Sequence, residues 1–442
     1  MTLTAILSRR QAHRRTFALA WPMILSNITI PLLGLVDTAV IGHLDEAYYL
    51  GGVAVGSMII TFLMWMLGFL RMGTTALVAQ GLGADDIPAQ FAVLKQGVAL
   101  ALVLALWLLL LQWPIRHWGL PLAGGSEEVQ RFAAEYFAIR IWGAPAALVN
   151  LVLLGFLLGR GQPRVAMWQL LLGNGLNIAL DLLLVVGLGW GVAGAAWASL
   201  AAEYGTLALA AVLVWRQLRG NPALDWYPAL QGVGRLVRLN RDIFLRTLCL
   251  QLCFSFVTLM GARLGDTVVA GNAVLMNFLL VISYALDGFA YSAEVEVGRA
   301  WGARDRAQLR QAVVLGWFWS AVTALVFVVL FALAGEGMIL LLTDIDAVRA
   351  HAIRYLPWVV ALPALAFSCF LFDGVYIGAA LGRPMRNAML VSALGFFALW
   401  WGFHGLGNHG LWLALCGFML LRGLTLGWHY LVRLNPQAHW AG

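Results

Sequence analysis

The amino-acid sequence predicts an all-α membrane protein that crosses the bilayer many times. Of its 442 residues, 62% are hydrophobic and only 11% are charged, whereas soluble globular proteins carry roughly 25% charged residues. The apolar runs reach about 20 residues or more, which is typical of membrane-spanning helices, whereas outer-membrane barrels show short alternating segments. We therefore expect a polytopic α-helical protein embedded in a lipid bilayer.

Charged residues, glycines and prolines divide the chain into twelve candidate spans. A span needs about 20 residues, so the longer ones are expected to tilt or to project into water. The predicted spans are residues 15–41, 48–72, 89–113, 129–158, 165–187, 192–216, 242–263, 268–298, 308–334, 347–381, 386–404 and 410–432.

Basic residues are unevenly distributed between the connections. With the N-terminus in the cytoplasm, twenty-one of the 28 Lys and Arg residues lie on the cytoplasmic side, and only Arg116, Arg131, Arg263 and Arg349 lie outside. Cytoplasmic connections carry such an excess, so both termini are expected in the cytoplasm. Residues 1–14 lack the short apolar core and cleavage site of a signal peptide and are expected to remain as a cytoplasmic segment.

The longest polar connection, at about residues 217–241, separates six spans from six others. We expect an N-terminal lobe at 15–218, a cytoplasmic linker at 219–240, a C-terminal lobe at 241–433 and a cytoplasmic tail at 434–442. An even number of spans in each half gives parallel repeats. Three short matches at offsets of 219, 221 and 216 indicate an internal duplication, and they pair residues 81–86 with 300–305, 161–164 with 382–385, and 191–194 with 407–410.

Composition also excludes several classes of function. The net charge of +7 does not indicate a nucleic-acid partner, because the basic residues recur between apolar runs and form no single patch. The four cysteines and eight histidines match no metal-binding or HExxH-type spacing. An intramembrane enzyme is disfavoured because the sequence offers no clustered nucleophile or acid–base pair. We expect no cofactor, and we expect a monomer.

The stretch from Asn27 to Leu44 places a carboxylate, Asp37, inside an apolar span. A charge at the centre of a spanning helix costs about 2.5 to 3.5 kcal/mol, so such a residue is a functional candidate by default. The alternative is an interfacial position, because a shift of one turn would bring Asp37 to the outer headgroups. Pro22 and Pro31 precede it, and proline removes a backbone hydrogen bond and bends a helix. We therefore expect a hinge in the first span.

Span five offers Asp37 two partners. Asn177 and Asp181 are four residues apart, which places them on one helix face, and Ser199 follows in span six. At about 1.5 Å per residue, all four groups fall in the outer half of the bilayer. Two neighbouring carboxylates in a low dielectric oppose each other's ionisation, and a proton or Na+ bound at these four residues would relieve that repulsion. Asn177 by itself could equally serve an interhelical hydrogen bond.

Polar residues of the C-terminal half are open to more than one interpretation. Asp287 and Asp373, near mid-depth in spans eight and ten, could bind a cationic substrate or a second proton, or could pair within the lobe. Glu203, Glu294 and Glu296 are interpreted as structural or interfacial. A stripe of Met and aromatic residues could line a cleft for amphipathic molecules because Met surfaces re-pack, although core packing also explains it. The stripe contains Met260, Met276, Phe289 and Tyr291.

Several segments resemble one known family. The N-terminal segments PLLGLVDTAVIGH (31–43), LGGVAVG (50–56), AQGLGAD (79–85), GNGLNIALD (173–181) and GVAGAAWAS (191–199) resemble the multidrug and toxic compound extrusion (MATE) family. The C-terminal segments NAVLM (272–276), YALDGFAY (284–291) and LFDGVYIG (371–378) resemble its DNA-damage-inducible F (DinF) branch.

The resemblance implies twelve helices in two lobes, export of organic compounds and coupling to inward H+ or Na+. Asp37 would be the coupling carboxylate, with Asn177, Asp181 and Ser199 as partners and Pro22 as a hinge. Other branches place a glutamate on the seventh helix, whereas no acidic residue occurs between Ile243 and Ala262 here.

The expected function is a secondary antiporter that exports amphipathic or cationic organic compounds across a bacterial inner membrane by alternating access. The alternative is a flippase for lipids or lipid-linked saccharides in the same superfamily. A flippase for anionic head groups would be expected to have a more cationic cleft, and few basic residues lie within the spans. A plain channel is disfavoured by the duplicated lobes and the paired carboxylates.

The substitution Asp37→Asn tests the role of this carboxylate. It removes the charge that H+ or Na+ would neutralise, so coupled export from vesicles should be lost while the protein still folds. Proton-driven export that survives the substitution would contradict the assignment.

Overall fold

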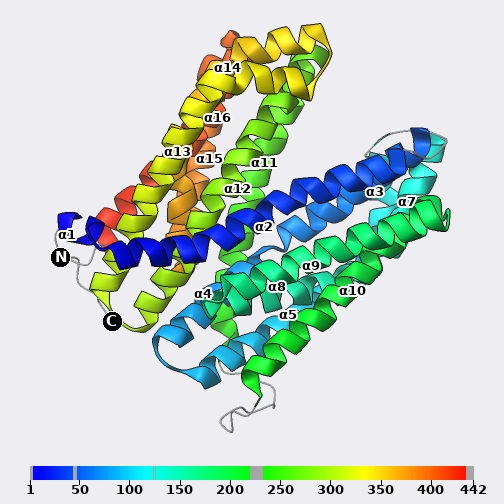
Figure 1. The fold of residues 1–442 in the computed structure, drawn as a ribbon. Coiled ribbons are helices and arrows are strands. Elements are labelled where there is room, and N and C mark those ends of the chain that lie inside the picture. The colour runs from blue at the N-terminus through cyan, green and yellow to red at the C-terminus, as the bar shows by residue number, and fades with distance from the viewer. Residues whose placement is uncertain (1–2, 43–46, 123, 125, 220–231, 435–442) are drawn as a thin grey trace. The chain divides into compact units, whose positions relative to one another are not determined.

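The computed structural model describes residues 3–42, 47–122, 124, 126–219 and 232–434. Within these ranges every regular element is a helix, which confirms the predicted all-α class (Figure 1). Eleven helical stretches of this described part are long and apolar enough to cross a membrane. After the short α1 (Leu3–Leu7), α2 (Arg10–Gly42) adds a helix of 33 residues.

Most spans of the N-terminal half consist of helices joined end to end. Span two combines α3 with α4, span three combines α5 with η1 and α6, span four combines α7 with η2 and α8, and span five combines α9 with η3. Short π or 3-10 turns at most of these joints change the hydrogen-bond register without ending the span. The bounds are α3 (Ala47–Met66), α4 (Phe69–Gly83), α5 (Ile87–Pro114), η1 (Ile115–Gly119), α6 (Leu120–Leu122), α7 (Glu127–Arg140), η2 (Ile141–Gly143), α8 (Ala144–Gly159), α9 (Pro163–Asp181), η3 (Leu182–Gly187) and α10 (Gly191–Leu218).

The C-terminal half has longer, continuous helices. Three of them have 33 to 37 residues, more than the roughly 20 that a bilayer requires. The seventh span begins at Val233, so residues 233–240, which we expected in the linker, are helical. The bounds are α11 (Val233–Leu264), α12 (Asp266–Gly302), α13 (Arg306–Leu342), α14 (Asp346–Gly378), α15 (Gly382–Phe403), η4 (His404–Leu406), α16 (Asn408–His429) and η5 (Tyr430–Leu434).

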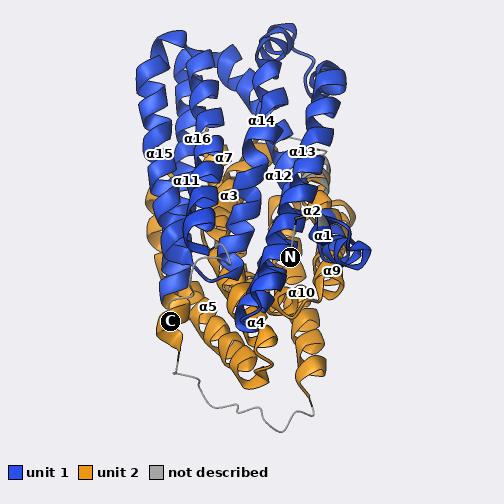
Figure 2. Cartoon of the chain, turned by 90° about the vertical axis from the view of Figure 1, so that its left-hand side faces the viewer, with its two compact units in different colours: residues 1–24, 238–442 blue, residues 25–237 orange. Residues whose placement is uncertain are grey.

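The chain forms two compact units, coloured separately in Figure 2. One contains residues 25–237, and the other contains residues 1–24 together with 238–442. Whereas we expected the whole first span in the N-terminal lobe, the first half of α2 packs with α12 and α13. Arg15 forms an ion pair with Glu296 at 2.7 Å, and the ring of Phe17 lies 4.4 Å from that of Trp319. These contacts attach residues 10–24 to the C-terminal half.

The turns after spans two and eight have the same backbone geometry. Asp85 and Arg304, 219 residues apart, have φ values of 53° and 54°. The next residues, Asp86 and Asp305, both cap a helix: in the following turn, the side chain of Asp86 accepts from one backbone N–H group and that of Asp305 from two. Because positive φ is uncommon outside glycine, its recurrence at one offset supports the internal duplication.

The turns after spans four and ten repeat at the same offset. Gly161 has φ 69° and Ala380 has φ 56°. In both turns the amide of this residue donates to the carbonyl three residues before it, at 2.8 Å. The structure therefore pairs Gly161 with Ala380, whereas the sequence comparison had paired it with Gly382. The sequence comparison had aligned the Gly-x-Pro motifs that begin at Gly161 and Gly382. Relative to the turn, this motif begins two residues later in the C-terminal half.

Helix packing repeats at the offset of 219 as well. A Cβ added to Gly155 of α8 would lie 2.6 Å from the carbonyl oxygen of Arg71, and one added to Gly374 of α14 would lie 2.2 Å from that of Ala290. One turn on, a Cβ at Gly378 would lie 2.3 Å from the carbonyl oxygen of Glu294. Small residues allow helix backbones to approach closely in membranes. The same glycine ridge therefore joins α8 to α4 in one half and α14 to α12 in the other.

The substitution Gly374→Ala should lower the stability of the protein by about 1 to 3 kcal/mol, because the new methyl group would overlap the α12 backbone. Thermal unfolding in detergent measures the loss. Gly337→Ala is the matched control: Gly337 lies in α13 with no atom near its would-be Cβ, and alanine is the better helix former. Equal melting temperatures for the two variants would contradict the close-packing argument.

Candidate functional site

A buried polar cluster lies between α9 and α10. The amide nitrogen of Asn177 donates to Oδ2 of Asp181 at 2.9 Å and reaches Oγ of Ser199 at 3.4 Å. Asn177 and Asp181 expose only 7% and 2% of their surface. They share one helix face because they are one turn apart, and α10 packs beside α9. Three of the four predicted coupling residues therefore meet.

The backbone of Asp37 lies in α2, but its side chain lies outside the part of the chain that the structure describes. A nearby contact indicates the level of its backbone. Asn174 donates to Oγ1 of Thr29 at 2.9 Å, which fixes α2 beside α9. With a helical rise of about 1.5 Å per residue, Asp37 is roughly 12 Å beyond this contact and Asp181 roughly 10 Å beyond it. The two backbones therefore reach a similar depth if both helices run outward.

The predicted hinge residues both lie inside α2. Pro22 is buried and Pro31 is exposed, and the helix continues through both positions from Arg10 to Gly42. The division between the two compact units falls after Ile24, two residues beyond Pro22.

A second polar pair in the N-terminal spans consists of Arg140, at the end of α7, and Glu203 of α10. Nη2 of Arg140 lies 2.9 Å from Oε1 of Glu203, and the two side chains are 11% and 23% exposed. Asn150 of α8 donates to the backbone carbonyl of Glu203 at 3.0 Å. The sequence alone indicates a structural or interfacial role for Glu203 and does not single out Arg140. The four-residue spacing of Ser199 and Glu203 predicts that they share a helix face. The 63 residues between Arg140 and Glu203 give no indication that these two side chains pair.

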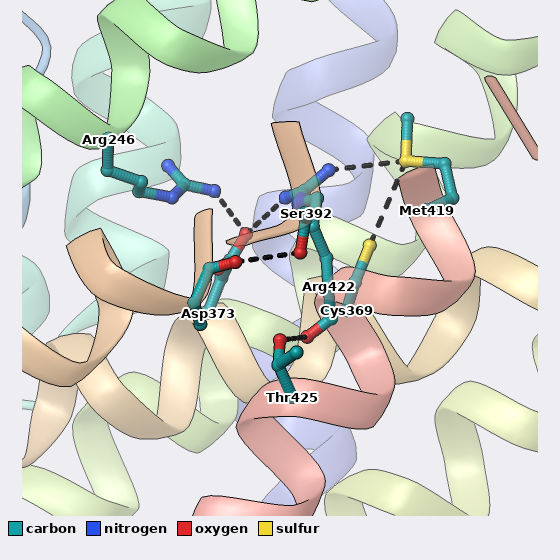
Figure 3. A network of polar contacts seen from close by, with 8 residues as sticks. Arg246, Cys369, Asp373, Ser392, Met419, Arg422 and Thr425 are labelled. Atoms are coloured by element: carbon teal, nitrogen blue, oxygen red, sulfur yellow. Dashed lines mark hydrogen bonds and ion pairs between the residues drawn. The ribbon is translucent and has the colours of Figure 1, made fainter. Parts of the chain in front are cut away.

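The C-terminal half contains a buried ionic network, drawn in Figure 3. Oδ2 of Asp373 in α14 forms ion pairs with Arg246 of α11 and with Arg422 of α16, the latter at 2.6 Å. Arg246, Asp373 and Arg422 are 7%, 10% and 3% exposed at the side chain. Nη1 of Arg422 also contacts the sulfur of Met419 at 3.2 Å. The network thus joins three helices of one lobe through a single carboxylate.

Asp287 of α12 lies close to this network. It interacts electrostatically with Arg422 and with Tyr284. The two intramembrane carboxylates that could have bound a cationic substrate therefore both have cationic neighbours within their own lobe. Sequence spacing does not indicate that Arg246 and Arg422 face Asp373, because they are 127 and 49 residues away from it along the chain.

The Met and aromatic residues proposed for a cleft lie in different surroundings. Met260 and Met276 pack at the edge of the C-terminal hydrophobic core. Phe289 is 3% exposed, and its ring lies 5.7 Å from that of Phe17. Tyr291 is partly exposed in α12. Core packing accounts for Phe289, and the other three retain some accessible surface.

Comparison with known proteins places this architecture in a family. The MatE family profile matches residues 22–183 and 243–399. The chain belongs to the MatE family. It is 49% identical over 411 residues to DNA damage-inducible protein F of Escherichia coli strain K12, covering 92% of this chain and 90% of that protein. It is also 29% identical over 440 residues to a probable multidrug resistance protein NorM of Deinococcus radiodurans, covering 95% of each.

The fold agrees with solved structures. A MOP superfamily transporter from Pyrococcus furiosus superposes with a TM-score of 0.87 at 21% identity, covering 95% of each chain. These findings confirm twelve helices in two lobes, a multidrug-type transporter of the MATE family, and resemblance to its DinF branch. The relatives are transporters, which agrees with the expectation that the chain is not an enzyme.

The substitution Asp373→Asn tests the C-terminal network. It leaves Arg246 and Arg422 buried without their shared carboxylate, and loss of one partner from a buried ion pair destabilises proteins by about 3 to 5 kcal/mol. Thermal unfolding in detergent should show a large drop. Asp344→Asn is the control, because this carboxylate is fully exposed in its pair with Arg349 and exposed pairs contribute about 0 to 1 kcal/mol. Similar melting temperatures for both variants would contradict the structural role.

Proposed function

We propose that this transporter is a secondary antiporter that exports amphipathic, cationic organic compounds in exchange for protons. The buried cluster of Asp181, Asn177 and Ser199 is the observation that carries the proposal. A carboxylate at this depth is costly when charged. Protonation removes this cost, so proton binding at the cluster can shift the conformational equilibrium of the lobe.

The orientation of Asn177 favours H+ over Na+ as the coupling ion. Its amide nitrogen faces both Asp181 and Ser199, whereas hard cations are ligated by oxygen atoms. Ligation of Na+ would require this amide to turn over and to lose its hydrogen bond to Asp181. Protonation of Asp181 requires no such change, because the carboxylic acid still accepts a hydrogen bond at its second oxygen.

The C-terminal carboxylates support coupling through the N-terminal lobe alone. Asp373 is held by Arg246 and Arg422, and Asp287 lies near Arg422. A carboxylate with a cationic partner gains little from a further cation, because its charge is already compensated. We therefore propose Asp37, Asn177, Asp181 and Ser199 as the coupling site and assign Asp373 a structural role.

We propose that the first span transmits the change. Neutralisation of Asp37 would alter the bend of α2 near Pro22 and Pro31, because proline weakens the helix there. Since α2 contributes to both compact units, a change in its bend would bias the equilibrium between inward-facing and outward-facing states. We also propose, from the distribution of basic residues, that the transporter lies in the inner membrane of a bacterium with both termini in the cytoplasm.

The proton gradient supplies enough energy for export. Exchange of one proton for one monovalent cation moves no net charge, so the pH gradient drives it. One pH unit corresponds to about 1.4 kcal/mol, which sustains a tenfold concentration ratio of the substrate. The name of the Deinococcus relative, a probable multidrug resistance protein, supports organic drugs as the substrate class for this chain as well.

Everted membrane vesicles test the antiport. Transport of a fluorescent organic cation, ethidium, should follow the pH gradient: nigericin, which collapses that gradient in potassium buffer, should stop it. Collapse of an imposed Na+ gradient should leave transport unchanged. Dependence on Na+ instead would reverse the assignment of the coupling ion, and dependence on neither gradient would exclude antiport.

A further inference from the structure

The ion pair of Arg140 and Glu203 has no role in the antiport described so far. It lies within the N-terminal spans, where a charged pair is expensive to bury. Only one hydrogen bond joins the two side chains. Nε and Nη1 of Arg140 and Oε2 of Glu203 are buried without a hydrogen-bond partner among the described residues. A partly satisfied ionic pair is less stable than apolar packing, so its presence calls for a function.

The pair continues the coupling cluster along α10. Ser199 and Glu203 are four residues apart, so they point from the same helix face and lie about 6 Å apart along the axis. Asn177 contacts Ser199 from α9. With the N-terminus inside, α10 enters from the outer surface, which places Glu203 one turn closer to the cytoplasm than the cluster.

Further polar groups lie on the cytoplasmic side of Glu203. Asn150 donates to the carbonyl of Glu203, and Gln169 of α9 reaches the carbonyl of Asn150 at 3.5 Å. At the end of the two helices, the side chain of Gln217 donates to that of Gln162. Polar side chains therefore extend from Asp181 to the cytoplasmic ends of α9 and α10, which pack together along this length.

Unpartnered atoms along this path indicate hydration. Oδ1 of Asn150 and Oε1 of Gln169 are buried without a hydrogen-bond partner in the described structure, as are the three atoms of the Arg140 and Glu203 pair. Several donors and acceptors that converge in one region make a favourable site for water. Gly143 leaves room for Oε2 of Glu203, because a Cβ at that position would overlap this oxygen.

The charged group in contact with Glu203 in the described structure comes from α7. Arg140 of α7 is in contact with it, and Tyr136, one turn earlier in α7, interacts with Arg140. Asp181 is the carboxylate at the far end of α9. The helices α8 and η2, which also pack on α10, contain no charged or titratable residue. Along α9 and α10, Glu203 is the next carboxylate on the cytoplasmic side of Asp181.

We propose that Glu203 is a relay carboxylate that carries the coupling proton from the Asp181 cluster to the cytoplasm. This inference rests on the proposed proton antiport. The proton leaves the carboxylic acid of Asp181, adds to a carboxylate oxygen of Glu203 through water, and then departs to water on the cytoplasmic side. No electron pair is transferred, both carboxylates end ionised, and Arg140 remains protonated throughout.

Arg140 leaves one oxygen of the relay carboxylate available. Its Nη2 lies 2.9 Å from Oε1 of Glu203, whereas Oε2 has no hydrogen-bond partner in the described structure. Oε2 is therefore the oxygen to which the arriving proton adds.

Two transport assays on Glu203→Gln test the relay. Uptake of ethidium into everted vesicles, driven by a pH gradient, requires proton transfer, whereas counterflow of ethidium in proteoliposomes at equal pH does not. We expect gradient-driven uptake to fall by about a hundredfold, within the range that a lost proton-transfer group costs, and counterflow to stay within about twofold. Glu203→Asp should restore part of the driven uptake, and Glu135→Gln, an exposed carboxylate of α7, should behave as the unmodified protein.

Each other result overturns the relay. Normal driven uptake in Glu203→Gln shows that the carboxylate carries no proton, and equal loss of uptake and counterflow assigns it to substrate binding or to folding. If Glu203→Gln does not fold, the double variant Arg140→Gln with Glu203→Gln removes both charges, and the same separation of the two assays is expected. Failure of the antiport itself differs from these results, because the unmodified protein would then ignore the pH gradient.

Discussion

Close contact between helix backbones at glycine is the constraint on which both lobes depend. In lipid, no hydrophobic force favours one helix contact over another, so packing relies on how closely the backbones can approach. Gly155 and Gly374 provide this approach at equivalent positions, against the carbonyls of Arg71 and Ala290. Larger residues at either position would separate the helices that surround the polar groups of that lobe.

The duplicated scaffold carries different charges in its two copies. In the N-terminal half, the amide nitrogen of Asn177 donates to Asp181. In the C-terminal half, Asp373 is bound by two arginines. The N-terminal carboxylate accepts from a neutral amide, whereas the charge of the C-terminal one is compensated by two cations. The division of roles between the lobes therefore follows from side-chain chemistry on one common backbone plan.

The coupling cluster and the Arg140 and Glu203 pair form one polar layer along α10, where the cluster meets α9 and the pair meets α7. On α9 the polar face contains Gln169, Asn177 and Asp181, which are eight and four residues apart, and on α10 it contains Ser199 and Glu203, four residues apart. Such a layer weakens the apolar packing of the lobe, and the ridge at Gly155 lies on α8, outside that layer. Rigid packing on one side and a polar layer on the other allow a transporter to combine a fixed scaffold with a site that changes its charge.

The sequence by itself determined the class, the number of spans, the duplication and the meeting of Asn177, Asp181 and Ser199. These features follow from hydropathy and from helical periodicity, which are local properties of the chain. Tertiary structure alone decided which arginine faces which carboxylate, since Arg246 and Asp373 are 127 residues apart and Arg140 and Glu203 are 63 apart. It also decided that residues 10–24 pack with the C-terminal half. Contacts between distant helices depend on their rotation and relative height, and no local pattern encodes these two quantities.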